Sequence, residues 1–201
     1  MTLSSPPPVL IVLTGPSGVG KDAVIDRLAE LGVDIVRPAT MTTRAPRAGE
    51  IEGTHHYFVT REAFAEHLAS GELLEHAEYD GNLYGVPRRS VRAALDTGKH
   101  VVLRVDVQGA ESLRAILPTA IFISLEPEDI EVLRRHLEAR GSETPEGIEH
   151  RIATARSEIE RARAFCRSIR NIHGRLDEAV EAVRDLIAAE LGRTGRQPIA
   201  L

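Results

Sequence analysis

The stretch that decides the fold reads VLIVLTGPSGVGKDAV, at residues 9–24. Residues 9–14 form a short apolar run rich in β-branched side chains, which is typical of a buried parallel strand. A glycine-rich turn follows, and apolar residues then recur at helical spacing until Gly32 ends the pattern. Strand, glycine turn and helix in this order predict a phosphate-binding loop of the form G-x-x-x-x-G-K.

The loop residues suit the binding of nucleotide phosphates. Glycines at positions 15, 18 and 20 allow backbone N–H groups to turn towards an oxyanion, and the helix N-terminus adds its dipole. Lys21 can reach the β- and γ-phosphates. The alternative is a glycine turn without a ligand, but the strand before the loop and the helix after it favour binding.

Asp22 stands where this loop normally carries a serine or threonine that holds magnesium. A carboxylate at a helix start gains about 0.3–1 kcal/mol from the dipole. A phosphate ~5 Å away would repel it by roughly 3 kcal/mol at an effective dielectric of ~20. A cation must therefore lie between them, and our hypothesis is that Asp22 holds Mg²⁺ directly or through water.

A second carboxylate, Asp106, ends the apolar run HVVLRVD at residues 100–106. Enzymes with a phosphate-binding loop place a metal-positioning aspartate at such a strand end. The alternative is a turn cap before Gly109. We expect Asp106 to be the second residue of a magnesium site.

Strands and helices alternate along the chain, which predicts an α/β fold with a parallel sheet flanked by helices. Ligands in such sheets bind outside the carboxyl ends of the strands, where the loop and Asp106 both fall. Besides residues 9–14, we expect strands at 33–40, 54–60, 100–106, 120–125 and 167–172, a hairpin at 73–87, and helices at 61–71, 88–98, 111–116, 127–141, 144–165 and 177–191.

The composition of the chain limits the classes of function that it can have. The chain of 201 residues fits one domain, and 42% apolar with 27% charged residues is an ordinary globular mix. A net charge of −5 argues against nucleic-acid binding. A lone cysteine, Cys166, excludes an internal disulfide, and no apolar run could cross a membrane. We expect a cytoplasmic protein with a disordered leader at residues 1–8 and a loose tail at 192–201.

Four motifs in order, GPSGVGK, TTRAPRAGEIEG, LLEHAEYDGNLYGVP and VDVQGA, resemble guanylate kinase, from about Val9 to Leu191. The second motif packs two arginines into a polar loop, and guanidinium groups grip phosphates bidentately. The resemblance implies a P-loop NTPase-type fold, Mg²⁺, and phosphoryl transfer from ATP to GMP. It also implies a nucleotide-binding core (9–37, 89–129 and 158–201), a GMP-binding insert (38–88) and a helical lid (130–157).

The resemblance also implies roles by position. Glu75 would accept hydrogen bonds from guanine, whose donor pair adenine lacks. Thr40 would lie beside the guanine, and Asn171 near the adenine of ATP. The cations around the transferring phosphoryl group would be Lys21, Arg44, Arg140 and Arg151. The GMP phosphate would bind Arg44, Arg47 and Tyr84, and ATP would bind Gly15, Pro16, Ser17, Gly18, Val19, Gly20, Lys21 and Asp22.

Several positions depart from the family pattern. His56 aligns with a phosphate-binding tyrosine, and Tyr57 comes one residue later. We keep both as GMP-binding candidates, although period-two geometry lets only one face the ligand. Val86 stands where the family often has a hydroxyl group near guanine. Arg104 replaces a frequent aspartate, and His136 replaces a lid arginine.

Two other functions stay open. A ribose 1,5-bisphosphate phosphokinase would share the GKD of the loop, whereas Glu75 and TTRAPRAGE favour GMP. A non-catalytic guanylate-kinase-like binding module would not need Lys21 or the lid arginines. The chain could be a monomer or a homodimer. Transfer needs no general base, because the attacking GMP oxygen is already anionic, so the protein's task is to position and neutralise phosphates.

Overall fold

The computed structural model describes residues 6–79, 81–140 and 144–201, without the side chains of His136 and Arg140. Strands and helices alternate as the sequence predicts. The elements are β1 (Leu10–Thr14), α1 (Lys21–Glu30), β2 (Ile35–Val36), β3 (Thr40–Thr42), β4 (His56–Phe58), α2 (Arg61–Ala69), β5 (Leu73–Tyr79), β6 (Asn82–Pro87), α3 (Arg88–Asp96), β7 (His100–Arg104), α4 (Val107–Ile116), β8 (Ile121–Pro127), α5 (Ile130–Arg140), α6 (Pro145–Arg163), β9 (Arg167–Asn171) and α7 (Leu176–Leu191).

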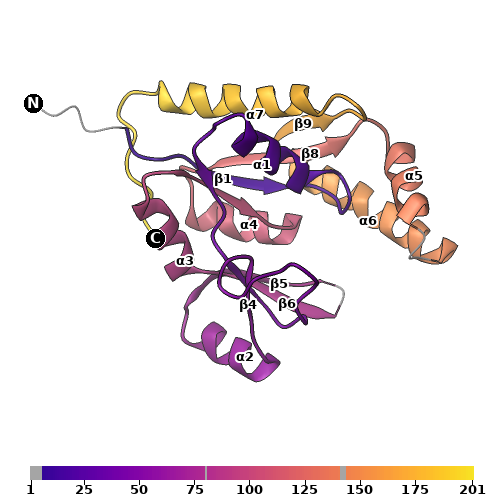
Figure 1. The fold of residues 1–201 in the computed structure, drawn as a ribbon, viewed down its shortest axis with the longest axis horizontal. Helices are drawn as coiled ribbons and strands as arrows, with labels where there is room; N and C mark the ends of the chain where they lie inside the picture. Colours follow the sequence, from indigo (N-terminus) through magenta and orange to yellow (C-terminus); the bar gives the residue numbers. More distant parts are fainter. Residues whose placement is uncertain (1–5, 80, 141–143) are drawn as a thin grey trace, which may run out of the picture.

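The main sheet is parallel and has the order β2-β7-β1-β8-β9, which confirms the predicted parallel sheet. Helices α1 and α7 lie on one side of it, and α3 and α4 lie on the other (Figure 1). The central strand β1 serves both layers, because its side chains alternate between the two faces. Ile11 and Leu13 join the core under α1 and α7, whereas Leu10 and Val12 join the core over α3 and α4.

A second, smaller sheet has the order β4-β3-β6-β5 and its own core around Met41, Phe64 and Leu73. The predicted hairpin is confirmed, since β5 and β6 pair antiparallel. The single strand predicted at 33–40 is wrong, because β2 joins the main sheet and β3 joins the small one. Pro38 explains the break, since proline lacks an N–H donor and restricts the residue before it.

Helices α5 and α6 pack on each other through a second small core, and the pair extends away from the main sheet (Figure 1). Leu133 and Leu137 of α5 meet Ile148 and Ile152 of α6 there. The predicted cap of α6 is confirmed, as the Thr144 hydroxyl accepts a hydrogen bond from the Gly147 N–H at 3.2 Å. The pair is also anchored to the main body, because α6 contacts α4, β8 and β9, and α5 contacts β8.

The carboxyl-terminal tail is packed, so the prediction that it is loose is wrong. Arg196 donates hydrogen bonds to the carbonyls of Pro7 and Pro8, at 2.7 and 3.0 Å. Ile199 and Leu201 cover the edge of the core over α3 and α4. These contacts come from residues far apart in sequence, which local patterns do not reveal. Within the described ranges, no helix has the length and apolarity needed to span a bilayer.

Candidate functional site

The loop between β1 and α1 is a backbone cradle that only glycine can form. Gly15, Gly18 and Gly20 have φ values of 135°, 83° and 97°, which L side chains rarely adopt. A Cβ on Gly15 would lie 2.3 Å from the Leu125 carbonyl oxygen, and one on Gly20 would lie 2.4 Å from Nδ2 of Asn171. The predicted glycines therefore have a geometric reason, and their N–H groups are available for an anion at the start of α1.

Lys21 lies folded into this cradle. Its Nζ donates hydrogen bonds to the carbonyls of Gly15 and Pro16, at 2.5 and 3.0 Å. Burial and the charge of Arg104 lower the pKa of the Lys21 ammonium to about 8. A bound phosphate would supply the negative charge that this buried ammonium lacks, so Lys21 is poised for an anionic ligand.

Asn171 fixes the loop from the far end of the sheet, because its Nδ2 donates to the Val19 carbonyl at 2.8 Å. A hollow of about 220 Å³ opens beside this bond. Its walls are largely apolar or glycine, which suits the flat face of a base. The residues lining it are Gly18, Val19, Gly20, Ala23, Pro127, Val132, Leu133, Asn171, Ile172, His173, Gly174 and Leu176.

The Asp22 carboxylate is held by two arginines from neighbouring strands. Its Oδ1 accepts a hydrogen bond from Nη1 of Arg37 at 3.1 Å and lies 3.3 Å from Nε of Arg104. Arg37 follows β2, and Arg104 ends β7 beside β1. The cation that the sequence argument requires next to Asp22 is thus present as protein side chains. Whether Asp22 also holds magnesium stays a prediction.

Asp106 caps helix α4, since its Oδ1 accepts a hydrogen bond from the Gly109 N–H at 2.8 Å. The cap that the sequence offered as an alternative is therefore real, and it makes α4 begin at Val107 rather than at residue 111. The charge of Asp106 also reaches the loop, where it tends to raise the pKa of Lys21. The cap does not exclude a metal, because the carboxylate has a second oxygen.

Metal chemistry fits this pair of carboxylates only with help from phosphates. No group of three or more histidine, cysteine, aspartate or glutamate side chains in the described part of the chain could hold a metal ion. Mg²⁺ commonly takes one or two protein carboxylates and completes its shell with water and substrate phosphates. Asp22 and Asp106 offer that number of hard oxygen donors, and the charges of both act on Lys21.

The predicted acceptor residues meet on one face of the small sheet. Thr40 and His56 are bonded through Oγ1 and Nδ1 at 2.7 Å, and the His56 and Tyr84 rings are 6.5 Å apart. Arg44 holds Glu50 bidentately, with Nη–Oε distances of 2.8 and 3.0 Å. These bonds, and a further one to Tyr84, raise the pKa of Arg44. The face therefore presents an ordered guanidinium, as a phosphate site requires.

His56 and Tyr57 lie on opposite faces of β4. His56 shares its face with Thr40 and Tyr84, whereas Tyr57 packs against the Met41 core and lies under the Arg89 guanidinium. Burial lowers the pKa of His56 and favours the neutral imidazole. The arrangement supports His56 as the acceptor-site residue and speaks against Tyr57, as the period-two argument allows only one of them.

Glu75 is the most unusual carboxyl group of the site. Its side chain is only 7% exposed, and Oε2 is buried without a hydrogen-bond partner. Burial, and next the charge of Asp106, raise the pKa of Glu75 to about 8. A Cβ on Gly109 would lie 2.7 Å from Oε2, so α4 approaches this carboxyl closely. A buried polar atom kept without a partner points to a ligand donor.

The remaining predicted cations are less closely tied to the site. Arg47 is exposed, and its backbone N–H donates to Glu50 at 2.7 Å. Arg151 is half-buried on α6. Arg140 ends α5, and its side chain lies outside the described residues, as does that of His136.

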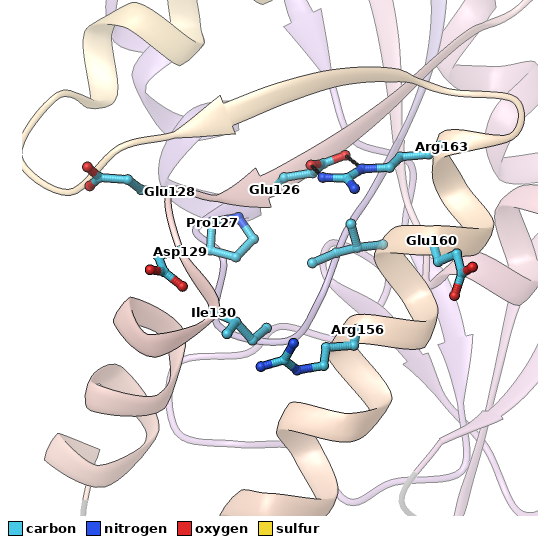
Figure 2. A pocket seen from close by; sticks show the side chains of 9 residues that line it. Glu126, Pro127, Glu128, Asp129, Ile130, Arg156, Glu160 and Arg163 are labelled. Carbon is cyan, nitrogen blue, oxygen red and sulfur yellow. Dashed lines mark hydrogen bonds and ion pairs between the residues drawn. The ribbon is translucent and has the colours of Figure 1, made fainter.

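A larger hollow of about 430 Å³ lies where β8 leads into α5, against α6 (Figure 2). Arg163 binds Glu126 on its wall, with Nε and Oε1 3.0 Å apart, and Arg156 also lines it. None of the predicted site residues lines this hollow. Because it lies where α5 joins the main sheet, we interpret it as a feature of the joint between the sheet and the helical pair.

Sequence reasoning missed four residues that bind or face predicted ones. Glu50 belongs to the motif TTRAPRAGEIEG, but nothing in the motif shows that it binds the Arg44 guanidinium bidentately. Arg37 and Arg104 bind Asp22 from other strands. Glu158 of α6 is partly buried, and its charge acts to raise the pKa of Lys21. These pairings depend on the fold, so a pattern of neighbours along the chain carries no signal for them.

Comparisons with known proteins agree with this geometry. The family model described as "Guanylate kinase" matches residues 8–190. "Guanylate kinase 2, chloroplastic/mitochondrial" from Oryza sativa subsp. japonica is 42% identical over 199 residues, covering 98% of this chain and 70% of that protein. "Guanylate kinase" from Clostridium perfringens strain SM101 is 38% identical over 188 residues, covering 94% and 86%. The crystal structure of guanylate kinase from Anaplasma phagocytophilum has a TM-score of 0.74 at 32% identity, covering 94% and 89% of the two chains.

Proposed function

This chain belongs to the guanylate kinase family, and on that premise we propose how its own residues transfer the γ-phosphoryl group of ATP to GMP, giving ADP and GDP. The observation that carries the proposal is Glu75, a buried carboxyl group with an unpartnered oxygen beside the ordered Arg44 face. Guanine offers an N1–H and an amino group to such an oxygen, whereas adenine offers an acceptor at N1. Glu75 therefore selects the base that can satisfy it.

The donor binds at the glycine loop. Its β- and γ-phosphates accept hydrogen bonds from the loop N–H groups, and Lys21 exchanges the carbonyls of Gly15 and Pro16 for a phosphate oxygen. The adenine occupies the hollow beside Asn171. We assign ATP binding to Gly15, Pro16, Ser17, Gly18, Val19, Gly20, Lys21, Asp22 and Asn171.

The acceptor binds on the small sheet. Arg44, Arg47, His56 and Tyr84 hold the GMP phosphate, and Thr40 and Glu75 hold the guanine. A GMP phosphate oxygen attacks the γ-phosphorus, a new P–O bond forms, and the bond to the ADP oxygen breaks. The nucleophile is already anionic, so no side chain has to remove a proton, and catalysis rests on alignment and charge neutralisation.

Magnesium, if bound, would supply positive charge that neutralises the phosphates during transfer. Asp22 and Asp106 are the residues that would hold it, directly or through water. Helices α5 and α6, as the lid at 130–157, would bring Arg140 and Arg151 to the transferring group and exclude water. Their small shared core holds the two helices together.

The test is ADP release with GMP, AMP or ribose 1,5-bisphosphate as acceptor. We expect turnover with GMP at least 100-fold above that with AMP, because a mismatched base leaves Glu75 unpaired. Lys21→Ala should lose activity with every acceptor, and Glu75→Gln should lose the preference for GMP. Arg184→Gln, on the far helix α7, serves as the matched control. Higher turnover with ribose 1,5-bisphosphate than with GMP would contradict the proposal.

A further inference from the structure

Three parallel strand ends bring two arginines and one aspartate together beside the glycine loop. The sheet order places β7 between β2 and β1, and Arg104 is registered against Leu13, one residue before the end of β1. Arg37 comes directly after β2. Both arginines bind Asp22 in the first turn of α1. The cluster therefore carries a net charge of +1, where the sequence alone shows a lone carboxylate.

The two arginines are held differently. Arg37 binds Asp22 and also lies 3.7 Å from Asp26 on the same helix, so two carboxylates share its charge. Arg104 binds Asp22 through Nε, and within the described part of the chain Asp22 is its one ion-pair partner. A guanidinium has five N–H donors, so Arg104 keeps donors for another anion. Its side chain is 41% exposed, which leaves it open to a ligand.

Arg104 acts on both halves of the site. Its charge is the second cause that lowers the pKa of Lys21, and it also lowers the pKa of His56. Lys21 belongs to the donor loop and His56 to the acceptor face. Geometry agrees, because Asp106, two residues after Arg104, caps α4 at Gly109, and a Cβ on Gly109 would lie 2.7 Å from Oε2 of Glu75. The strand end that carries Arg104 therefore borders both the donor loop and the acceptor sheet.

We propose that Arg104 is a phosphate-binding residue for both substrates, and that Asp22 positions it between the donor triphosphate and the acceptor monophosphate. The inference rests on the proposed function, since it assumes ATP on the loop and GMP on the small sheet. Asp22 would then have a second role, the positioning of Arg104, in addition to holding a metal ion. Stabilising the fold is a poor explanation of the cluster, because exposed ion pairs contribute little.

The experiment measures the dissociation constants of ATP and GMP separately, by calorimetry in EDTA and again with magnesium. Arg104→Gln should weaken metal-free binding of each nucleotide roughly 10- to 100-fold, the loss of a hydrogen bond to a charged group. Arg37→Gln is the matched control, because it removes the other arginine on Asp22 and should leave GMP binding within twofold of the wild type. Binding of both nucleotides within twofold in Arg104→Gln would overturn the proposal, and so would weakening of only one.

A double-mutant cycle tests the positioning role of Asp22. If Asp22 holds Arg104 in place, the effect of Arg104→Gln on GMP binding should shrink at least threefold in the Asp22→Asn background. Additive effects would overturn that role. Thermal unfolding of each variant separates a folding defect from a binding defect. A wild-type chain that binds ATP but not GMP would instead contradict the proposed function.

Discussion

Replacing Glu75 by glutamine tests whether this buried carboxyl group binds GMP while lowering the stability of the fold. Burial, followed by the charge of Asp106, raises the pKa of Glu75 from 4.5 to about 8. At pH values between 4.5 and about 8, the folded chain keeps a proton on Glu75 that the unfolded chain has released. The free energy of unfolding therefore falls as pH rises through this range. The loss is roughly 3 kcal/mol by pH 7 and roughly 4 kcal/mol by pH 8, where half of the folded chains have released the proton.

Glutamine does not titrate, so the variant should escape this loss. We expect the difference in unfolding free energy between Glu75→Gln and the wild type to grow by about 1.4 kcal/mol per pH unit between about pH 5.5 and 7, and more slowly towards pH 8. Urea denaturation at each pH measures it, and Glu78→Gln, at an exposed position on the same strand, controls for the introduction of a glutamine. Parallel pH profiles for Glu75→Gln and the wild type would refute the reasoning.

The same group links GMP binding to proton release. Guanine offers two donors, so Glu75 must lose its proton when GMP binds at pH 7. Calorimetry in two buffers of different ionisation enthalpy should show the wild type releasing close to one proton more per GMP than Glu75→Gln. The phosphate of GMP contributes equally in both proteins and cancels. Equal proton release in the two proteins would show that Glu75 is not the guanine acceptor.

Three further substitutions probe the remaining geometry. Gly109→Ala places a methyl carbon 2.7 Å from the buried carboxylate, so we expect roughly 1–3 kcal/mol of lost stability by urea denaturation and a raised KM for GMP alone. Gly20→Ala adds a Cβ 2.4 Å from Nδ2 of Asn171, at a φ of 97°, so titration should show that ATP binding is lost. Gly98→Ala is the control, because its φ of 77° is also positive but a Cβ there meets open space, and ATP binding should be kept. Glu50→Gln weakens the bidentate bonding of the Arg44 guanidinium. Steady-state kinetics should then show the KM for GMP rising roughly 10- to 100-fold. An unchanged KM would mean that Glu50 has no role in binding GMP.

Local patterns in the sequence account for the core and the donor loop. The run at residues 9–14 predicts β1, and the glycines that follow need positive φ values, which the structure has. Alternation of strand and helix predicts the parallel sheet, and the D-G-N turn within the motif LLEHAEYDGNLYGVP is the local signal for the β5–β6 hairpin predicted at 73–87. These features depend on neighbours along the chain, and so a sequence alone reveals them.

The missed features depend on contacts between distant segments. Pro38 divides one apolar stretch between two sheets, which is visible only when both sheets exist. Arg104 looks like a simple departure from the family pattern until β7 brings it to Asp22. The packed tail depends on Arg196 meeting carbonyls near the other terminus. Period-two geometry restricts the choice between His56 and Tyr57, and the register of β4, which sets His56 opposite Thr40, favours His56.

The central claim is that phosphates held by the glycine loop and by the small sheet meet for direct transfer. The measurement that tests it most directly follows the γ-phosphoryl label of Mg·ATP during incubation with GMP. The account predicts that the label appears in GDP, in a one-to-one ratio with the ADP formed. Label recovered mainly as inorganic phosphate, or remaining on ATP while both nucleotides are bound, would contradict it.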